Sequence, residues 1–144
     1  MNIQKLKIIL CSIFLFCSCS KDEIKDEISY EKIEENTLSY SDEEKIEKQF
    51  IVFESENEWL DFIPQIERVN PDRAENFRNI DIDFSNYDLI IVIGEFFNYC
   101  CSKINIKSVH RIDDKTIVDF EESGPGEATA LSQAYLILKI KKEK

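Results

Sequence analysis

A run of five apolar residues limits the possible folds of this chain more than any other segment. It consists of Leu89-Ile90-Ile91-Val92-Ile93, with no polar residue inside it. A strand with one face in water alternates polar and apolar side chains, whereas a strand that is covered on both faces is apolar throughout. We therefore predict that this run is a central strand of a sheet, buried on both faces.

One amphipathic helix is predicted early in the chain. Ser55 and Glu58 form a capping box, in which each side chain satisfies a backbone donor at the start of a helix. Apolar residues then recur at helical spacing on one face, and they are Trp59, Phe62, Ile63 and Ile66. We expect Trp59 to be the largest buried contact of that face. Pro64 falls inside the pattern and is expected to kink the helix or to end it at Ile63.

Several other segments predict strands, because they are apolar, rich in β-branched and aromatic residues, or alternate in polarity. These segments are residues 50–53, 104–108, 116–120 and 134–140. The second and third of them flank the polar pair Asp113-Asp114 and are predicted to form an antiparallel hairpin.

Two segments are less regular. Residues 67–86 predict a loop with one helical turn near residues 72–77, whereas the apolar spacing of residues 28–40 fits either a helix or an irregular first strand. The order of all these elements predicts an α+β fold, a β-dominated antiparallel sheet or sandwich with one main helix early in the domain. A single domain over residues 28–144 has room for one modest core.

The first residues have the anatomy of a secretory signal. Two lysines precede an apolar segment over residues 8–16, and the small residue Ser18 precedes Cys19. This pattern resembles the lipobox of bacterial lipoproteins, in which the signal is cut before a cysteine that carries the lipid. We expect residues 1–18 to be removed and Cys19 to be lipidated, which attaches the protein to a membrane. The alternatives are lipidation of Cys17 and an ordinary secreted protein.

The residues after Cys19 predict where the anchor lies. Lys21-Asp22-Glu23 resembles the short lysine-acid-acid signal that sends some lipoproteins to the outer face of the outer membrane. We therefore expect a bacterial outer membrane lipoprotein that is exposed on the surface, with a periplasm-facing anchor as the alternative. Residues 19–27 are charged and are predicted to be an acidic tether between the lipid and the domain.

The charge of the chain argues against a nucleic-acid partner. The formal net charge is −11, and loss of the leader removes two of the 18 Lys and Arg and none of the 29 Asp and Glu, which leaves −13. Binding to phosphates requires a basic face. The acidity instead keeps a surface protein soluble and repels anionic headgroups.

The chain has five cysteines, of which Cys11 and Cys17 leave with the leader and Cys19 carries the lipid. The remaining pair is Cys100-Cys101. An adjacent pair either closes a vicinal ring, bridges to another chain, or consists of two small buried hydrophobes. The three interpretations stay open at this point.

No motif of catalysis or metal binding is present. The single His110 has no partner at ligand spacing, so no metal or other cofactor is predicted, and we expect His110 to be a surface residue on a strand. A hydrolase would need His110 as its base, with Ser102, Ser108 or a thiol as nucleophile, and no third group orients it. Acidic pairs are predicted to be solvated turn residues, and they are Asp81/Asp83, Asp113/Asp114 and Glu121/Glu122. We predict no catalytic residues and no enzymatic activity.

Three segments carry a resemblance to a known family. They are residues 50–59 (FIVFESENEW), 82–92 (IDFSNYDLIIV) and 132–140 (SQAYLILKI). Segments of this kind, in this order, resemble small lipoproteins with a PrcB-like C-terminal domain, a family named for a subunit of a surface protease complex. Family members carry a glycine pair in the loop after the buried strand, where this chain has Cys100-Cys101. The closing motif also departs from the family pattern, at Ser132, Ala134 and Leu136.

The resemblance and the residues together imply a lipid-anchored, non-enzymatic domain that binds another protein, as an accessory or inhibitor-like partner of a surface protease. The contacts are expected in two loops, residues 96–102 and 123–129, that a rigid sheet presents side by side. The contact residues would be Phe96, Phe97, Tyr99, Cys100, Cys101, Gly124, Pro125 and Gly126. Phe97 is expected to fill the core more than Tyr99. The alternatives are a calcium- or glycan-binding surface module and a hydrolase.

Overall fold

The computed structural model describes residues 26–40 and 44–143. Within those residues the elements are β1 (Asp26–Glu27), β2 (Tyr30–Ser39), β3 (Gln49–Phe53), α1 (Glu56–Val69), α2 (Pro71–Arg78), β4 (Tyr87–Cys100), β5 (Lys103–Ile112), β6 (Lys115–Ser123) and β7 (Ala128–Lys141). The predicted signal over residues 1–18, the lipidation site Cys19 and the segment Lys21-Asp22-Glu23 lie outside the described residues.

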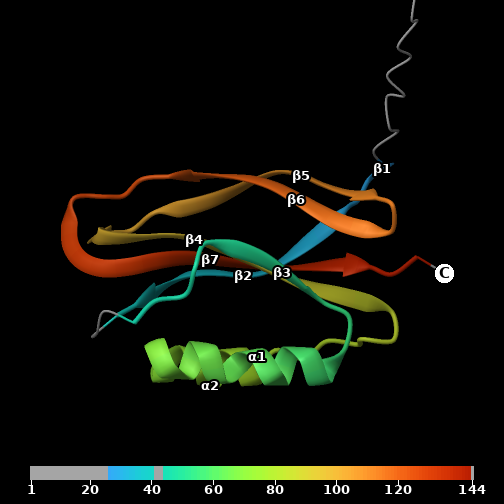
Figure 1. Ribbon diagram of the computed structural model, residues 1–144, viewed down its shortest axis with the longest axis horizontal. Helices are drawn as coiled ribbons and strands as arrows, with labels where there is room; N and C mark the ends of the chain where they lie inside the picture. Colours follow the sequence, from blue (N-terminus) through green and yellow to red (C-terminus); the bar gives the residue numbers. More distant parts are fainter. Residues whose placement is uncertain (1–25, 41–43, 144) are drawn as a thin grey trace, which may run out of the picture.

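The elements stack in three layers (Figure 1). A four-stranded sheet in the order β2-β7-β4-β3 lies in the middle, with a three-stranded sheet in the order β1-β5-β6 on one side and the two helices on the other. Every strand pair is antiparallel. The α+β, β-dominated prediction is therefore confirmed, although a second helix accompanies the main one.

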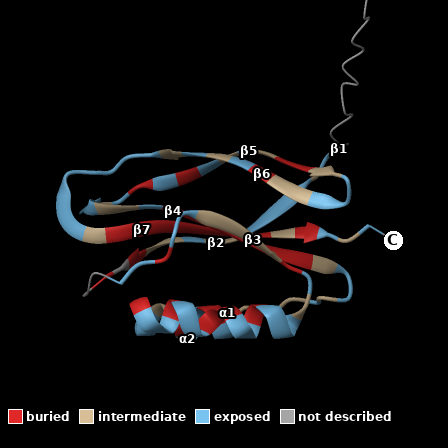
Figure 2. Ribbon diagram, viewed as in Figure 1, coloured by how far each residue is buried: buried red, intermediate tan, exposed pale blue. Residues whose placement is uncertain are grey.

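The predicted central strand is confirmed. Residues 89–93 of β4 are fully buried, and β4 lies between β3 and β7. Leu89, Ile91 and Ile93 belong to the apolar cluster that includes the helices, whereas Ile90 and Val92 belong to the cluster that includes β5 and β6. Figure 2 shows this buried band between the outer layers. Each such side chain stabilises the fold by about 1.5–3 kcal/mol when it is fully buried. The run therefore favours packing of the helices on one face of β4 and of β5 and β6 on the other.

The helix α1 begins where the sequence predicts it. The Ser55 side chain accepts a hydrogen bond from the Glu58 N–H at 3.4 Å. The second half of the capping box is different, because the Glu58 carboxylate accepts from the Glu54 N–H at 2.8 Å rather than from that of Ser55. The predicted apolar face is buried, at Trp59, Phe62, Ile63 and Ile66.

The expectation that Pro64 ends this helix at Ile63 was wrong, since α1 continues to Val69. Pro64 lies on the exposed face of the helix. A residue at that position would normally donate to the Leu60 carbonyl, and the Leu60 side chain is exposed as well. Water can therefore satisfy the free carbonyl, which lowers the cost of a proline inside a helix.

The loop predicted over residues 67–86 is shorter than expected, because α1 continues to Val69 and the single helical turn predicted near residues 72–77 is the longer helix α2. Asn70 caps this helix, because its side chain accepts a hydrogen bond from the Arg73 N–H at 3.1 Å, and Pro71 occupies the first turn. Both are helix-start signals. Ala74 and Phe77 are fully buried against the rest of the core. Neither described helix is long and apolar enough to cross a bilayer.

The N-terminal segments correct two expectations. The predicted tether does not extend to residue 27, because Asp26–Glu27 forms β1 and pairs with Arg111 and His110 of β5. The segment from residue 28 to 40, which fitted helix or strand, contains the strand β2, and this strand pairs with β7 along its length. The glutamates and lysine of β2 favour a helix, but hydrogen bonding to the backbone of β7 outweighs that preference.

The other strands are longer than predicted. The β5–β6 hairpin is confirmed, with Asp113 and Asp114 in its turn at φ of 48° and 62°, a conformation that Asp tolerates better than most residues. However, β4 extends to Cys100 and β7 begins at Ala128. Most of the predicted loop over residues 96–102 is therefore strand, because β7 supplies pairing partners as far as Cys100.

Candidate protein-binding site

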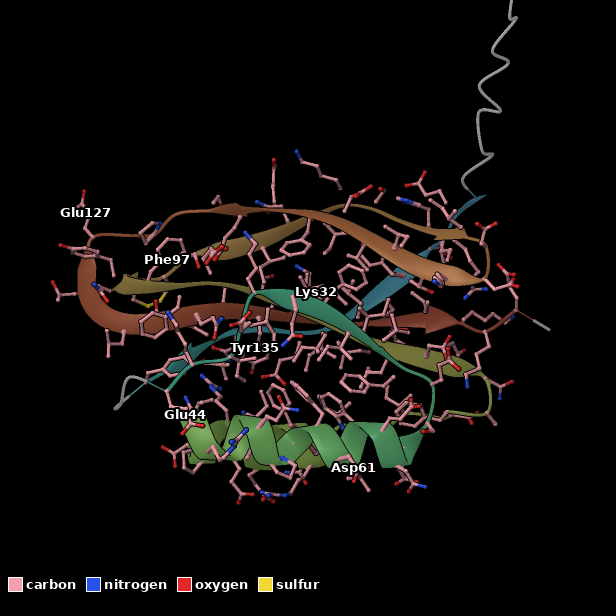
Figure 3. The ribbon with its side chains drawn as sticks, in the orientation of Figure 1. Lys32, Glu44, Asp61, Phe97, Glu127 and Tyr135 are labelled. Atoms are coloured by element: carbon pink, nitrogen blue, oxygen red, sulfur yellow. A yellow bond between two sulfur atoms is a disulfide. The ribbon has the colours of Figure 1, made fainter. Side chains whose placement is uncertain are left out.

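The two segments that the sequence singles out lie together at one end of the molecule. Tyr99 pairs with Thr129, and Cys100 pairs with Ala128, in the β4–β7 ladder. We call residues 96–102 and 123–129 together the disulfide tip. The β6–β7 connection forms the outer edge of this tip at the left of Figure 3, where Glu127 points away from the molecule.

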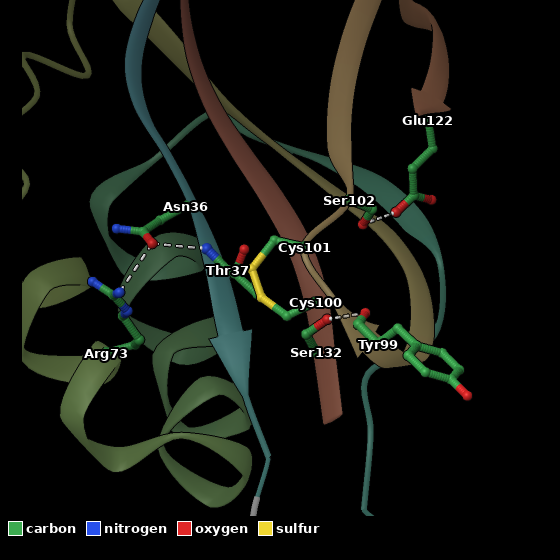
Figure 4. Close-up of a disulfide and its surroundings, with 9 residues drawn as sticks. All are labelled: Asn36, Thr37, Arg73, Tyr99, Cys100, Cys101, Ser102, Glu122 and Ser132. Atoms are coloured by element: carbon green, nitrogen blue, oxygen red, sulfur yellow. Dashed lines mark hydrogen bonds between the residues drawn. A yellow bond between two sulfur atoms is a disulfide. The ribbon is translucent and has the colours of Figure 1, made fainter. Parts of the chain in front are cut away.

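The disulfide tip contains a bond between two adjacent cysteines. Cys100 and Cys101 form a vicinal disulfide (Figure 4). Of the three interpretations that the sequence left open, the vicinal ring is the one observed. Cys101 is exposed and Cys100 is half-buried, so the pair does not act as two buried hydrophobes.

Two glycines allow the second segment to lie against the first. A Cβ atom at Gly126 would lie 2.5 Å from the Cys100 carbonyl oxygen. Gly124 has a φ of 116°, and a Cβ atom there would lie 2.9 Å from the Ser102 Cα. Only glycine fits such positions. The two segments of the disulfide tip therefore approach each other closely through Gly124 and Gly126, and residues 96–102 need no glycine pair for this.

Hydrogen bonds hold the base of the disulfide tip. The Ser132 hydroxyl donates to the Tyr99 carbonyl at 2.9 Å, and the Ser102 hydroxyl donates to Glu122 Oε1 at 2.5 Å (Figure 4). The other oxygen of Glu122 accepts from the Glu95 N–H at 2.7 Å. The prediction that Glu122 is a solvated turn residue was therefore wrong, because it lies within β6 and links three segments.

The three aromatic residues of β4 differ in their surroundings. Phe96 packs edge-on against Tyr40, with ring centroids 5.1 Å apart, and borders the core. Phe97 is half-buried and lies on the side of β5 and β6 in Figure 3. Tyr99 is 49% exposed, one of three large apolar side chains with such exposure among the described residues. Phe96 rather than Phe97 is the aromatic residue that joins the core cluster, and Tyr99 faces solvent.

Two hollows adjoin Phe96. One has a volume of about 280 Å³ and the other about 390 Å³, and Lys45 and Phe96 line both. The Lys45 ammonium lies 5.3 Å from the centre of the Phe96 ring, a cation–π distance. Asn98 and Leu131 complete the larger hollow. The surface beside the disulfide tip is therefore shaped, with the Lys45 ammonium and the Phe96 ring bordering both hollows.

A buried glutamine supports the smaller hollow. The Gln133 amide nitrogen donates to the carbonyls of Ile46 at 2.7 Å and Gly94 at 2.8 Å, while its oxygen accepts from the Tyr40 hydroxyl. Burial raises the pKa of Tyr40 to about 12, and a hydrogen bond with the Ile46 backbone offsets part of this effect. Tyr40 therefore stays protonated and keeps donating at ordinary pH. In the sequence, only the segment over residues 132–140, which begins Ser-Gln-Ala-Tyr, draws attention to the residues of this network.

His110 is not the surface residue that the sequence predicts, because it is 3% exposed. The register shifts between Ile106 and Ser108, and β1 pairs across His110, so the simple alternation of β5 fails there. The Ser108 hydroxyl and the Asp119 carboxylate lie 3.3 Å and 3.7 Å from the same imidazole nitrogen, Nδ1. A catalytic triad needs its serine and its acid on opposite nitrogens. The arrangement is therefore unsuited to nucleophilic catalysis.

The described part of the chain lacks the arrangements of side chains that a thiol hydrolase or a metal site would need. The sulfur atoms of Cys100 and Cys101 are bonded to each other, and they precede β5, whereas His110 lies near its far end. Within residues 26–40 and 44–143, no three His, Cys, Asp or Glu side chains are grouped so as to hold a metal ion. Asp83 accepts hydrogen bonds from Ser85 and Asn86, which lower its pKa.

The comparisons with known proteins identify no relative. The sequence matches no family model, no curated protein and no solved structure. The resemblance to PrcB-like domains therefore stays a prediction from the three segments that carry it.

Proposed function

We propose that this protein is a lipid-anchored, non-enzymatic surface lipoprotein that binds another protein through the disulfide tip. The observation that carries the proposal is the composition of that tip. Of its 14 residues only Glu127 is charged, in a chain with 33% charged residues. Depletion of charge and the presence of an exposed aromatic side chain, here Tyr99, are typical of the centre of protein interfaces.

The position of the disulfide tip relative to the N-terminus supports the same proposal. The first described strand is β1, where Glu27 pairs with His110 near one end of β5. The disulfide tip lies at the other end, where Lys103 pairs with Ser123 (Figure 1). The eight residues from Lys103 to His110 span about 25 Å at 3.3 Å per residue. A lipid on Cys19 would thus hold the opposite end near the membrane and present the disulfide tip outward.

Preorganisation supports binding as well. The serine and glutamate hydrogen bonds at the base and the two closely packed glycines hold the backbone of the disulfide tip in one arrangement. A surface that is already ordered loses less conformational entropy when a partner docks. Within such a surface a few aromatic anchors carry most of the binding energy, and Tyr99 has the largest exposed aromatic area in the disulfide tip.

The finer parts of the proposal follow the sequence. We propose that Cys19 carries the lipid, that Lys21, Asp22 and Glu23 direct export to the cell surface, and that the partner is a surface protease for which this chain is an accessory or inhibitor-like subunit. The mixed apolar cluster shared by the two sheets supports a sandwich-like packing of one sheet on the other.

The test compares two tyrosines of similar exposure. Tyr99 is 49% exposed and Tyr30, on β2, is 43% exposed. The lipoprotein is purified from its native membrane with its bound proteins, as wild type, as Tyr99→Ala and as Tyr30→Ala. We expect one partner to be retained by wild type and by Tyr30→Ala, and to bind Tyr99→Ala about 1–3 kcal/mol more weakly.

Two other results would contradict the proposed binding function. Equal retention by all three proteins removes Tyr99 from the interface and contradicts docking at the disulfide tip. A hydrolytic activity that is lost in His110→Ala, together with normal binding by Tyr99→Ala, would place the function in catalysis instead.

A further inference from the structure

The Cys100–Cys101 disulfide cross-links no two elements of the fold. It joins adjacent residues at the end of one strand. A disulfide stabilises a protein mainly by closing a loop in the unfolded chain, and the effect grows with the length of that loop. A bond between neighbours closes almost no loop, so its contribution to stability is small. Its role has to lie in the surface that it forms or in its reactivity.

The two cysteines differ in exposure. Cys101 is exposed, whereas Cys100 is half-buried and its carbonyl faces the Gly126 backbone. Thiol–disulfide exchange depends strongly on which sulfur the attacking thiolate can reach. Cys101 is thus the more exposed of the two cysteines, and we expect attack there.

The first segment of the disulfide tip differs in charge from the chain as a whole. The chain as a whole carries a formal net charge of −11, which repels thiolates. Residues 96–102 contain no charged side chain, and the next residue, Lys103, is an exposed cation. A thiolate that approaches Cys101 therefore meets an uncharged segment that is followed by a cation, with the Glu122 carboxylate bound to the neighbouring Ser102.

We propose that the Cys100–Cys101 disulfide is a thiol-exchange site at which an external thiol attacks Cys101. The attacking sulfur forms a new bond to the Cys101 Sγ as the bond between the two cysteines breaks. The electron pair of the broken bond leaves on the Cys100 Sγ, which takes a proton from solvent. The external sulfur is oxidised and the Cys100 sulfur is reduced, so the step needs no further oxidant or reductant.

The fate of the adduct depends on the thiol. The released Cys100 thiolate stays next to the mixed disulfide and can attack Cys101 again, which expels a monothiol and restores the original bond. A dithiol instead completes the reduction, because its second thiol closes its own disulfide and releases Cys101 with two electrons gained by the pair. The reaction requires no docked protein, and it therefore stands separately from the proposed function.

The first test locates the adduct. Full-length protein in detergent is treated with 2-mercaptoethanol, quenched with acid, and its free thiols are blocked with N-ethylmaleimide before peptide mapping. We expect mercaptoethanol on Cys101 and maleimide on Cys100, in about tenfold excess over the reverse pattern, because access decides the site of attack. The reverse pattern of adducts, or a disulfide that stays intact in excess dithiothreitol, a dithiol, overturns the proposal.

The second test uses the separate thiols. Cys100→Ser leaves Cys101 as a free thiol, and Cys101→Ser leaves Cys100 as a free thiol. The rate at which each variant reacts with 5,5′-dithiobis(2-nitrobenzoate) is measured, and the variant with both cysteines replaced by serine gives the background rate. We expect the Cys101 thiol to react about ten times faster, as its exposure requires. Equal rates, or faster reaction of Cys100, contradict the assignment. Circular dichroism verifies that each variant is folded.

Discussion

The indole nitrogen of Trp59 donates a hydrogen bond to the backbone carbonyl of Phe77 at 3.2 Å, and the two rings stack with centroids 5.4 Å apart. This pair joins α1 to α2 beneath the middle sheet. Both side chains are buried. The contact makes Trp59 the connection between a helix that the sequence predicts in full and a helix of which it predicts only one turn.

Replacement of Trp59 should therefore destabilise the domain strongly. We expect Trp59→Ala to lower the free energy of unfolding by about 3–5 kcal/mol, because it removes a large buried side chain and leaves a cavity. Urea denaturation measures the change. Leu60→Ala is the matched control, since Leu60 is the next residue of α1 and is 46% exposed. If both variants unfold at the same urea concentration, the packing described for Trp59 is wrong.

Gly126 should tolerate no side chain. In Gly126→Ala the added Cβ would lie 2.5 Å from the Cys100 carbonyl oxygen, a backbone atom that cannot move aside alone. We expect a loss of about 1–3 kcal/mol in the free energy of unfolding, as for other overpacked sites. Ala130→Ser, at an exposed position of the same strand region, serves as control. A Gly126→Ala variant as stable as wild type would contradict the close approach of the two segments.

Two adjacent glutamates should respond differently. Glu122 accepts hydrogen bonds from Ser102 and Glu95, whereas Glu121 is exposed and pairs with Lys107 at 2.7 Å on the surface. Glu122→Ala should cost about 1–3 kcal/mol, since it leaves two donors without their acceptor. Glu121→Ala should cost at most about 1 kcal/mol, as is usual for exposed ion pairs. Thermal or urea unfolding compares them, and equal effects would argue against Glu122 as the link at the base of the disulfide tip.

Stability should fall in alkaline solution in a way that depends on Tyr40. Its pKa is raised to about 12 in the folded protein, mainly by burial. A phenol in the unfolded chain titrates near 10. The folded state thus holds the proton more tightly, so the contribution of Tyr40 is complete below about pH 10 and is lost as the pH rises toward 12.

The measurement is urea unfolding at a series of pH values between 8 and 11. Wild type should lose stability above pH 10 more steeply than Tyr40→Phe, which has no phenol to titrate at this position. Tyr135 also has a raised pKa, through burial and the neighbouring Glu34, and it is present in both proteins. Parallel pH profiles would show that Tyr40 titrates normally.

The anchor can be tested independently of the fold. We expect Cys19→Ala to remove the protein from the membrane fraction and to abolish incorporation of labelled palmitate, because the lipid chains supply the membrane affinity. Replacement of Lys21, Asp22 and Glu23 by alanine should leave the anchor intact and reduce protease accessibility on whole cells. Palmitate labelling of Cys19→Ala would refute the lipidation site, and unchanged accessibility of the triple variant would refute the export signal.

Local patterns were sufficient for the elements whose residues interact with their own neighbours in sequence. The buried run at residues 89–93, the start of α1 at Ser55 and the hairpin at Asp113-Asp114 were all predicted, because polarity, capping and turn conformation are set within a few residues. The same approach predicted only one helical turn where α2 forms, although Asn70-Pro71 carries a helix-start signal, because the few apolar residues of α2 give only a weak helical pattern.

The disulfide tip depends on contacts between residues far apart in the chain. The sequence pointed to residues 96–102 and 123–129, but as loops, and the strand pairing that extends β4 to Cys100 comes from β7, about 30 residues later. The burial of His110 depends on β1, and the role of Glu122 depends on Ser102 and Glu95. Local composition cannot encode such partners, because burial and hydrogen bonding there are settled only when distant strands pack against one another.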